Sequence, residues 1–360
     1  MNKHPKRIAA MFAVIIAAAI VYVTPALAQN IGKTIDVVYR DIKIYIDGNL
    51  IVPQDATGKI VEPFIYNGTT YLPLRAVGEA LGKPVQWDGA SNSVFIGETL
   101  SQEVTDITVG SAQELVAALG SNRRILLKEG VYNLTAVDPA VINDTSVSYQ
   151  EIYDGPELLL DGIHNLTIQG AADNKSEIVI DPRYAFVMNF KNCSDINISD
   201  VKAGHTEGGY CLGGVFSFEN SSGIQIDDAQ MYGCGTIGLN LLRATDIKVT
   251  NSSIYDCSYG IMTVDYSANV SFDNCVFRDN RGFTMVIVGH TSGFSVENCQ
   301  FLRNEADYTD DPMFSISQSE NVSVKNTEFA DNRAYKLIGE DDITFDASNT
   351  FENNSFDNAG

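Results

Sequence analysis

The residue types best suited to chemistry gather in one glycine-rich stretch, residues 204–214, which reads GHTEGGYCLGG. His205, Glu207 and Tyr210 lie close together within it. A histidine and a carboxylate at this spacing could form a general acid–base pair or hold a metal ion, and neighbouring glycines let the backbone approach a ligand. The alternative is a lateral turn tightened by glycines, with His205 hydrogen-bonded to the backbone and Cys211 packed inside.

A second candidate is the acidic stretch 305–312, which reads EADYTDDP. Asp307, Asp310 and Asp311 supply hard oxygen ligands of the kind that Ca²⁺ prefers. The stretch lacks the D-x-D-x-D-G spacing of a regular calcium loop, so a solvated acidic loop is the alternative. Calcium is the only cofactor that the sequence suggests.

These two stretches interrupt a repeat that defines the elements around them. An apolar-x-apolar pair recurs at steps of 21 to 30 residues, and the two-residue alternation indicates strands. Self-similarity at this period indicates a solenoid whose units bury their apolar faces by stacking on one another. The pairs are Leu166/Ile168, Ile196/Ile198, Ile224/Ile226, Ile247/Val249, Val270/Phe272, Phe294/Val296, Val322/Val324 and Ile343/Phe345.

Aligning the repeats on this pair reveals three further columns, which should stack at about 4.8 Å per coil. The first is apolar, the second is rich in asparagine and predicts a side-chain amide ladder, and the third is small and predicts a crowded inward turn. Their members are Met231, Ile254, Phe277, Phe301 and Phe329; Cys234, Cys257, Asn280, Asn304 and Asn332; and Ala229, Ser252, Cys275, Cys299 and Thr327. Each cysteine of a pair would lie above its mate, and we expect free buried thiols.

The repeat begins with a capping box, Ser111-x-x-Glu114, that predicts a short helix ending at Gly120. The run over residues 125–132 follows, which we interpret as a strand and then the motif EGVY. Helix, strand and this motif together resemble the N-terminal cap and first coil of pectate-lyase-like β-helices. The fold class predicted for residues 108–360 is therefore mainly β: a right-handed parallel β-helix with a short N-terminal capping helix.

A smaller unit over residues 36–98 precedes the solenoid. Asp47-Gly48 and Asn67-Gly68 predict hairpin turns, Pro73 opens a helix that runs to Leu81, and two strands follow around residues 85–88 and 93–96. The run YNGTTYLPLRAVGEALGKPVQWDGASNSVFIG resembles the copper amine oxidase N-terminal-like stalk domain of secreted bacterial proteins. The resemblance implies a small α+β adaptor at a surface or cell wall. It does not imply an oxidase, because the unit contains no histidine.

The first 28 residues have the features of a secretory signal: basic residues, an apolar run and a small-x-small site at Ala26-Leu27-Ala28. We therefore expect a secreted or cell-surface protein with no membrane span after signal cleavage; an uncleaved N-terminal anchor is the alternative. The whole chain carries a net charge of −22, which makes nucleic acid and anionic lipid poor partners. No oligomeric state is predicted.

Motifs of known β-helix enzymes are missing. Asp227-Asp228 and Gly289-His290 are the nearest fragments of a polygalacturonase-like site, and Arg281 and Arg333 are expected at the surface rather than as catalytic bases.

The sequence supports two hypotheses about function. The first is a non-catalytic envelope protein that binds a polysaccharide or cell-wall glycan on its lateral face. The second is a polysaccharide lyase or glycoside hydrolase with a lateral-groove site near His205 and Glu207, an analogy with the fold.

Overall fold

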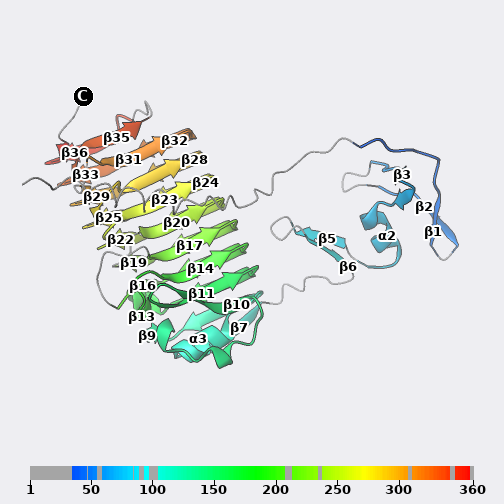
Figure 1. The fold of residues 1–360 in the computed structure, drawn as a ribbon, viewed down its shortest axis with the longest axis horizontal. Coiled ribbons are helices and arrows are strands. Elements are labelled where there is room, and N and C mark those ends of the chain that lie inside the picture. Colours follow the sequence, from blue (N-terminus) through cyan, green and yellow to red (C-terminus); the bar gives the residue numbers. More distant parts are fainter. Residues whose placement is uncertain are drawn as a thin grey trace, which may run out of the picture. The chain divides into compact units, whose positions relative to one another are not determined.

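The structure, a computed structural model, contains two compact units with their boundary after Val85 (Figure 1). Each unit is described by itself. The residues that the structure describes are 35–46, 48–54, 59–83, 85–88, 93–96, 104–206, 213–233, 237–306, 310–340 and 345–356.

The N-terminal unit has the predicted hairpins and helix. β1 (Ile44–Ile46) pairs with β2 (Asn49–Ile51), and β3 (Phe64–Tyr66) pairs with β4 (Thr69–Tyr71). Asn67 and Gly68 both have positive φ angles, 47° and 77°, as a tight hairpin turn requires. Helix α2 (Leu74–Ala80) begins directly after Pro73. The small α+β character is therefore confirmed.

The predicted strands around residues 85–96 are also present, as β5 (Val85–Asp88) and β6 (Ser93–Ile96), which form a two-stranded sheet.

The solenoid consists, in its described residues, of three sheets of nine strands each (Figure 1). Sheet 1 contains β7 (Thr105–Val109), β8 (Arg123–Leu127), β12 (His164–Gln169), β15 (Ser194–Ser199), β18 (Ser222–Asp227), β21 (Thr245–Thr250), β24 (Ala268–Asp273), β28 (Ser292–Glu297) and β32 (Glu320–Lys325). Sheet 2 contains β9 (Gly130–Asn133), β13 (Ser176–Ile180), β16 (Val201–His205), β19 (Gln230–Tyr232), β22 (Ser253–Tyr255), β25 (Val276–Arg278), β29 (Gln300–Leu302), β33 (Glu328–Ala330) and β36 (Thr350–Glu352). Sheet 3 contains β10 (Val147–Ile152), β11 (Gly155–Asp161), β14 (Phe186–Lys191), β17 (Gly214–Glu219), β20 (Ile237–Leu242), β23 (Gly260–Asp265), β27 (Val286–Gly289), β31 (Pro312–Ser317) and β35 (Lys336–Glu340).

Each coil passes from sheet 1 to sheet 2 to sheet 3, and the next coil pairs with it in parallel; β10, antiparallel to β11, is the exception among these strands. We call the three connections the 1–2, 2–3 and 3–1 corners. The 2–3 corner also holds a short four-stranded sheet of β26 (Arg281–Gly282), β30 (Glu305–Ala306), β34 (Arg333–Ala334) and β37 (Ser355–Phe356).

Helix α3 (Ala112–Ala118) caps the first coil and buries Leu115 and Val116 against it. The Ser111 hydroxyl accepts from the Glu114 N–H at 3.2 Å, as the capping box predicted. The Glu114 carboxylate, however, accepts from the N–H of Gly110 rather than from that of Ser111 itself. The helix also ends at Ala118, slightly before the predicted stop at Gly120.

The core follows the predicted columns. Aligned apolar pairs are register partners, for example Leu166 with Ile196 and Ile168 with Ile198. The Phe column continues as a ring stack with centroid separations of 4.7 Å (Phe277–Phe301) and 4.9 Å (Phe301–Phe329). These rings are buried, so each coil covers the apolar face of the one before it.

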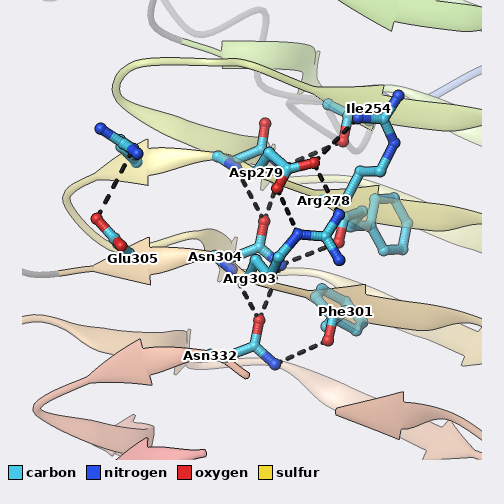
Figure 2. A network of polar contacts seen from close by, with 11 residues as sticks. Ile254, Arg278, Asp279, Phe301, Arg303, Asn304, Glu305 and Asn332 are labelled. Carbon is cyan, nitrogen blue, oxygen red and sulfur yellow. Dashed lines mark hydrogen bonds and ion pairs between the residues drawn. The ribbon is translucent and has the colours of Figure 1, made fainter. Parts of the chain in front are cut away.

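The asparagine ladder is confirmed at the start of the 2–3 corner (Figure 2). The Asn280 side chain donates to Asn304 Oδ1 at 2.9 Å, and that of Asn304 donates to Asn332 Oδ1 at 3.0 Å. Each of these oxygens also accepts the backbone N–H of the preceding member. The ladder therefore satisfies turn N–H groups that are buried away from water.

The column of small residues forms a comparable ladder at the 1–2 corner. Ala229 N–H donates to the Ser252 hydroxyl at 3.0 Å, and Cys275 N–H donates to Cys299 Sγ at 3.3 Å. Cys193, Cys275 and Cys299 are free and buried, as expected, and Cys257 is also buried, while Cys211 and Cys234 lie outside the described residues.

Replacing Asn304 by alanine should lower the free energy of unfolding by about 2–4 kcal/mol, because the variant loses several buried hydrogen bonds and leaves the Asn280 N–H without a partner. Guanidinium denaturation followed by circular dichroism measures the change. Gln225→Ala, at an exposed position of sheet 1, is the control and should change it by less than about 0.5 kcal/mol. Equal effects of the two substitutions would contradict a stabilising ladder.

Candidate functional site

The two sequence-predicted stretches lie along the same corner. Residues 206–213 connect β16 to β17 and residues 307–311 connect β30 to β31, so both belong to the 2–3 corner, several coils apart. Glu207, Tyr210 and Asp307 lie outside the described residues, and their roles stay predictions.

His205, the last residue of β16, is buried, with 4% of its surface exposed. Its Nε2 lies 2.9 Å from the carbonyl oxygen of Ala185. A carbonyl can only accept, so Nε2 carries the proton and Nδ1 presents a lone pair. Nδ1 is buried and has no partner within the described part of the chain. Burial lowers the pKa of His205, although the charge of Asp154 acts in the opposite direction, so the ring is neutral at pH 7.

The peptide group that follows Ala185 links His205 to a buried carboxylate. The N–H of Phe186 donates to Glu157 Oε2 at 2.6 Å, and Asn189 Nδ2 donates to Oε1 at 3.0 Å. Gln150 donates to the same Oε1 from the neighbouring strand β10. Glu157 is 3% exposed and is held by neutral donors alone among the described residues. Sequence analysis did not find this network, since Glu157 and Asn189 belong to none of the aligned columns.

A pair of tyrosines, one exposed and one half-buried, lies beside this network. Tyr153, at the turn between β10 and β11, is 85% exposed, and its ring centroid lies 4.8 Å from that of Tyr184 at an interplanar angle of 54°. The Asp154 carboxylate accepts the backbone N–H groups of Arg183 (2.7 Å) and Tyr184 (3.2 Å). These bonds join the turn that carries Tyr153 to the segment that carries Tyr184.

Glycine is required in the same turn. Gly155 has a φ of 149°, and a Cβ there would lie 2.7 Å from Pro182 Cγ. The close approach of Gly155 to Pro182 brings the two tyrosine-bearing segments together.

A second carboxylate, Asp181, stands at the same corner. Its Oδ1 accepts from Thr206 Oγ1 at 2.7 Å and from Asn133 Nδ2 at 3.0 Å, and its own N–H donates to the Thr135 hydroxyl. Thr206 directly follows His205 in the chain. We call the set Tyr153, Asp154, Asp181, Tyr184 and His205 the tyrosine–aspartate site.

The second stretch shows no assembled metal centre. Asp310 is exposed, and Asp311 Oδ1 accepts from Thr284 Oγ1 at 3.3 Å. The backbone carbonyl of Asp311 accepts from Tyr335 N–H. Within the described ranges no group of three His, Cys, Asp or Glu side chains is placed to hold a metal ion. Calcium binding by Asp307, Asp310 and Asp311 stays a prediction.

Two carboxylates in the later coils of this corner are paired with arginine (Figure 2). Asp279 forms a two-pronged ion pair with Arg303, at 2.7 and 2.9 Å, and also accepts from Arg278 at 3.0 Å. Arg281 lies 3.7 Å from Glu305 while 69% of its side chain is exposed. Arg333 is also exposed, so both residues expected at the surface are there.

A polar ladder that the sequence analysis missed covers the outer face of sheet 2. Lys202 Nζ lies 2.8 Å from Glu177 and 4.5 Å from the centre of the Tyr232 ring, whose hydroxyl donates to Glu177. The Tyr232 ring packs where a Cβ on Gly204 would stand. Burial opposes ionisation of Glu177, but the hydrogen bonds from Lys202 and Tyr232 outweigh it and lower the pKa. The ladder thus anchors the strand that ends at His205.

The fragments of a polygalacturonase-like site do not meet. Asp227 ends β18 at the 1–2 corner, whereas His290 follows β27 at the 3–1 corner. There His290 Nδ1 contacts Asp265 Oδ1 at 3.1 Å and its ring stacks on Tyr266 at 4.2 Å.

Comparisons with known proteins agree with the fold. The model of the right-handed β-helix region matches residues 163–308 and 213–360, more than half of the chain, so the chain belongs to the right-handed β-helix family. The copper amine oxidase N-terminal domain model matches residues 27–96 and 45–123. No curated protein sequence matches the chain. None of the helices in the described residues is long and apolar enough to cross a membrane.

Solved structures share the fold at low sequence identity. An alginate lyase from Paenibacillus sp. str. FPU-7 has a TM-score of 0.44 and 14% identity, covering 70% of this chain and 98% of its own. A pectin methylesterase from Aspergillus niger has a TM-score of 0.44 and 16% identity, with 71% and 86% covered. A pectate lyase from Paenibacillus sp. 0602 has a TM-score of 0.45 and 11% identity, with 65% and 72% covered. Likeness at this level carries no conclusion about activity.

The lowered pKa of His205 makes a testable contribution to stability. The unfolded chain binds a proton at higher pH than the folded chain, so this contribution is complete above pH about 6.5 and is lost as the pH falls toward the lowered value. His205→Gln, which keeps a donor for Ala185, should remove this part of the pH dependence. Unfolding free energies between pH 7.5 and 5 measure it, and an identical slope in wild type and variant would contradict the assignment.

Calcium binding by the acidic stretch predicts a higher melting temperature in Ca²⁺ than in a chelator, because a ligand that binds only the native state stabilises it. The double substitution Asp310→Asn with Asp311→Asn should abolish the difference. A melting temperature that does not respond to Ca²⁺ would rule the site out.

Proposed function

We propose that this chain is a secreted or cell-envelope protein that binds polysaccharide, without catalysis, at the 2–3 corner of its β-helix. The observation that carries the proposal is the Tyr153–Tyr184 pair, in which a ring that is 85% exposed is nevertheless held by a partner ring and by the Asp154 bridge. An aromatic face fixed in this way offers the C–H groups of a sugar ring an apolar surface with little loss of conformational entropy on binding.

The polar surroundings support recognition of a hydroxyl-rich ligand. Asp154 and Asp181 are exposed, and both are oriented by hydrogen bonds from the protein. A carboxylate oxygen can accept more than one hydrogen bond, so both groups can still accept from sugar hydroxyls.

The chemistry of His205 favours binding over catalysis. A general base must reach the proton that it abstracts, and this ring is 4% exposed with Nε2 already bonded to Ala185. The unpartnered Nδ1 lone pair is the observation that keeps a lyase or hydrolase site at His205, Glu207 and Tyr210 as a second candidate.

The remaining parts of the chain fit the same function. We assign residues 1–28 as a secretory signal, residues 36–98 as a stalk domain that attaches or spaces the β-helix at a surface, and residues 108–360 as the binding domain. The resemblance and family match of the stalk, together with the acidic composition, support this arrangement.

Tyr153→Ala should weaken binding to the recognised polysaccharide at least about tenfold, equivalent to about 1.4 kcal/mol, because it removes the exposed ring. Co-sedimentation with insoluble polysaccharides, assayed in parallel for released products, measures binding and activity together. Tyr266→Ala, which removes a tyrosine that is 52% exposed at another corner, should leave binding unchanged. Equal binding by all three proteins would contradict the proposal, and product release abolished by His205→Gln would favour the enzyme.

A further inference from the structure

The tyrosine–aspartate site has a surplus of hydrogen-bond acceptors. Asp154 is held by two backbone N–H groups, and Asp181 by a hydroxyl and an amide. No lysine or arginine within the described residues forms an ion pair with either carboxylate. Both groups are exposed, so a ligand can reach them.

Two buried polar atoms at the same place provide a second and independent observation. His205 Nδ1 is an acceptor without a partner on a side chain that is 4% exposed, and Asn189 Oδ1, beside the Glu157 carboxylate, is another. An acceptor left without a donor in a buried position is unfavourable, so these atoms indicate a donor that the described residues do not provide.

Two carboxylates in later coils of the same corner show the opposite arrangement. There Asp279 is paired with Arg278 and Arg303, and Glu305 with Arg281 (Figure 2). The fold can therefore neutralise carboxylates at this corner by placing an arginine one coil away, and among the described residues no such ion pair forms at the tyrosine–aspartate site. The charge there is available to a ligand.

Carboxylates without an ion-pair partner among the described residues, next to an exposed tyrosine ring, suit one chemical group in particular. An alkylammonium group has three donors and no acceptor, pairs with carboxylates, and is attracted to the face of a tyrosine ring. The chain as a whole carries −22, which raises the local concentration of cations and repels polyanions.

We propose that the glycan bound at the tyrosine–aspartate site carries protonated amino groups, as an amino-sugar polymer does after partial removal of its N-acetyl groups. This inference rests on the proposed function and specifies its ligand. Asp154 and Asp181 pair with the ammonium groups, Tyr153 and Tyr184 pack against the sugar rings, and a polysaccharide of uronate units is a poor ligand.

Three soluble probes test the inference by isothermal titration calorimetry at low salt and slightly acidic pH: a glucosamine oligosaccharide, the same oligosaccharide after full N-acetylation, and an oligogalacturonate of equal length. We expect the glucosamine oligomer to bind at least about tenfold more tightly than its N-acetylated form, and the oligogalacturonate to bind most weakly. The double substitution Asp154→Asn with Asp181→Asn removes both charges and leaves one acceptor oxygen at each position. It should erase the preference for the amine, while the N-acetylated oligomer, which carries no charge to pair with, should keep its affinity to within about threefold.

The matched control removes two exposed carboxylates elsewhere, by Asp227→Asn with Asp273→Asn at the 1–2 corner. It changes the net charge equally and should retain the preference. If it weakens amine binding as much as the site variant does, the preference comes from the net charge of the chain, and the site assignment is overturned. Melting temperatures of both variants establish that they are folded.

The outcomes separate this inference from the function on which it rests. Equal affinity for the amine and N-acetyl forms, with both lost in Tyr153→Ala, would overturn the charge inference and leave glycan binding intact. Tight binding of oligogalacturonate would also overturn it. Failure of all three probes, together with no binding to insoluble polysaccharides, would overturn both.

Discussion

Buried backbone N–H groups at the corners of this solenoid have no strand partner, and the side chain that satisfies each one comes from the next coil. Asn304 Oδ1 accepts from the backbone of Asn280, and Cys299 Sγ accepts from that of Cys275. Such a bond forms only when neighbouring coils are in register, because a shift of one residue would put the side chain on the wrong face. The ladders therefore fix the register, and the fixed register stacks the Phe column within 5 Å from ring to ring.

A fixed register also determines where a ligand can be recognised. The register constrains the strands of the three sheets. The 2–3 corner, in contrast, accepts connections of different lengths without disturbing the coils on either side. The tyrosine–aspartate site is built there from three segments far apart in sequence: the β10–β11 turn, the β13–β14 connection and the end of β16. Contacts between coils hold these segments, including the bonds of Asp154 to Arg183 and of Thr206 to Asp181. A rigid backbone thus presents a tyrosine ring and carboxylates in a constant arrangement.

Sequence periodicity was sufficient for the fold because the repeat imposes one residue type on each column. The apolar pairs, the Asn280–Asn304–Asn332 ladder and the paired Cys275 and Cys299 were all predictable from alignment of the coils. The candidate site was predictable only in its position, through His205. Tyr153 and Asp154 lie upstream of the regular coils, next to the antiparallel strand β10, where no column exists to mark them. Functional residues that occur in only one coil of a repeat protein produce no periodic pattern in the sequence. Which of them lie close together depends on the three-dimensional path of the chain.

The central claim is that glycan binds at the 2–3 corner of the first coils, on Tyr153, Tyr184 and the carboxylates beside them. Hydroxyl-radical footprinting of the full chain, with and without the glucosamine oligosaccharide, tests it most directly because tyrosine side chains are reactive probes of exposure. The account predicts protection of Tyr153 and Tyr184, with Tyr266 at the 3–1 corner reacting equally in both states. Protection confined to Tyr266, to the outer face of sheet 1 or to the N-terminal unit, with Tyr153 still fully reactive, would contradict it.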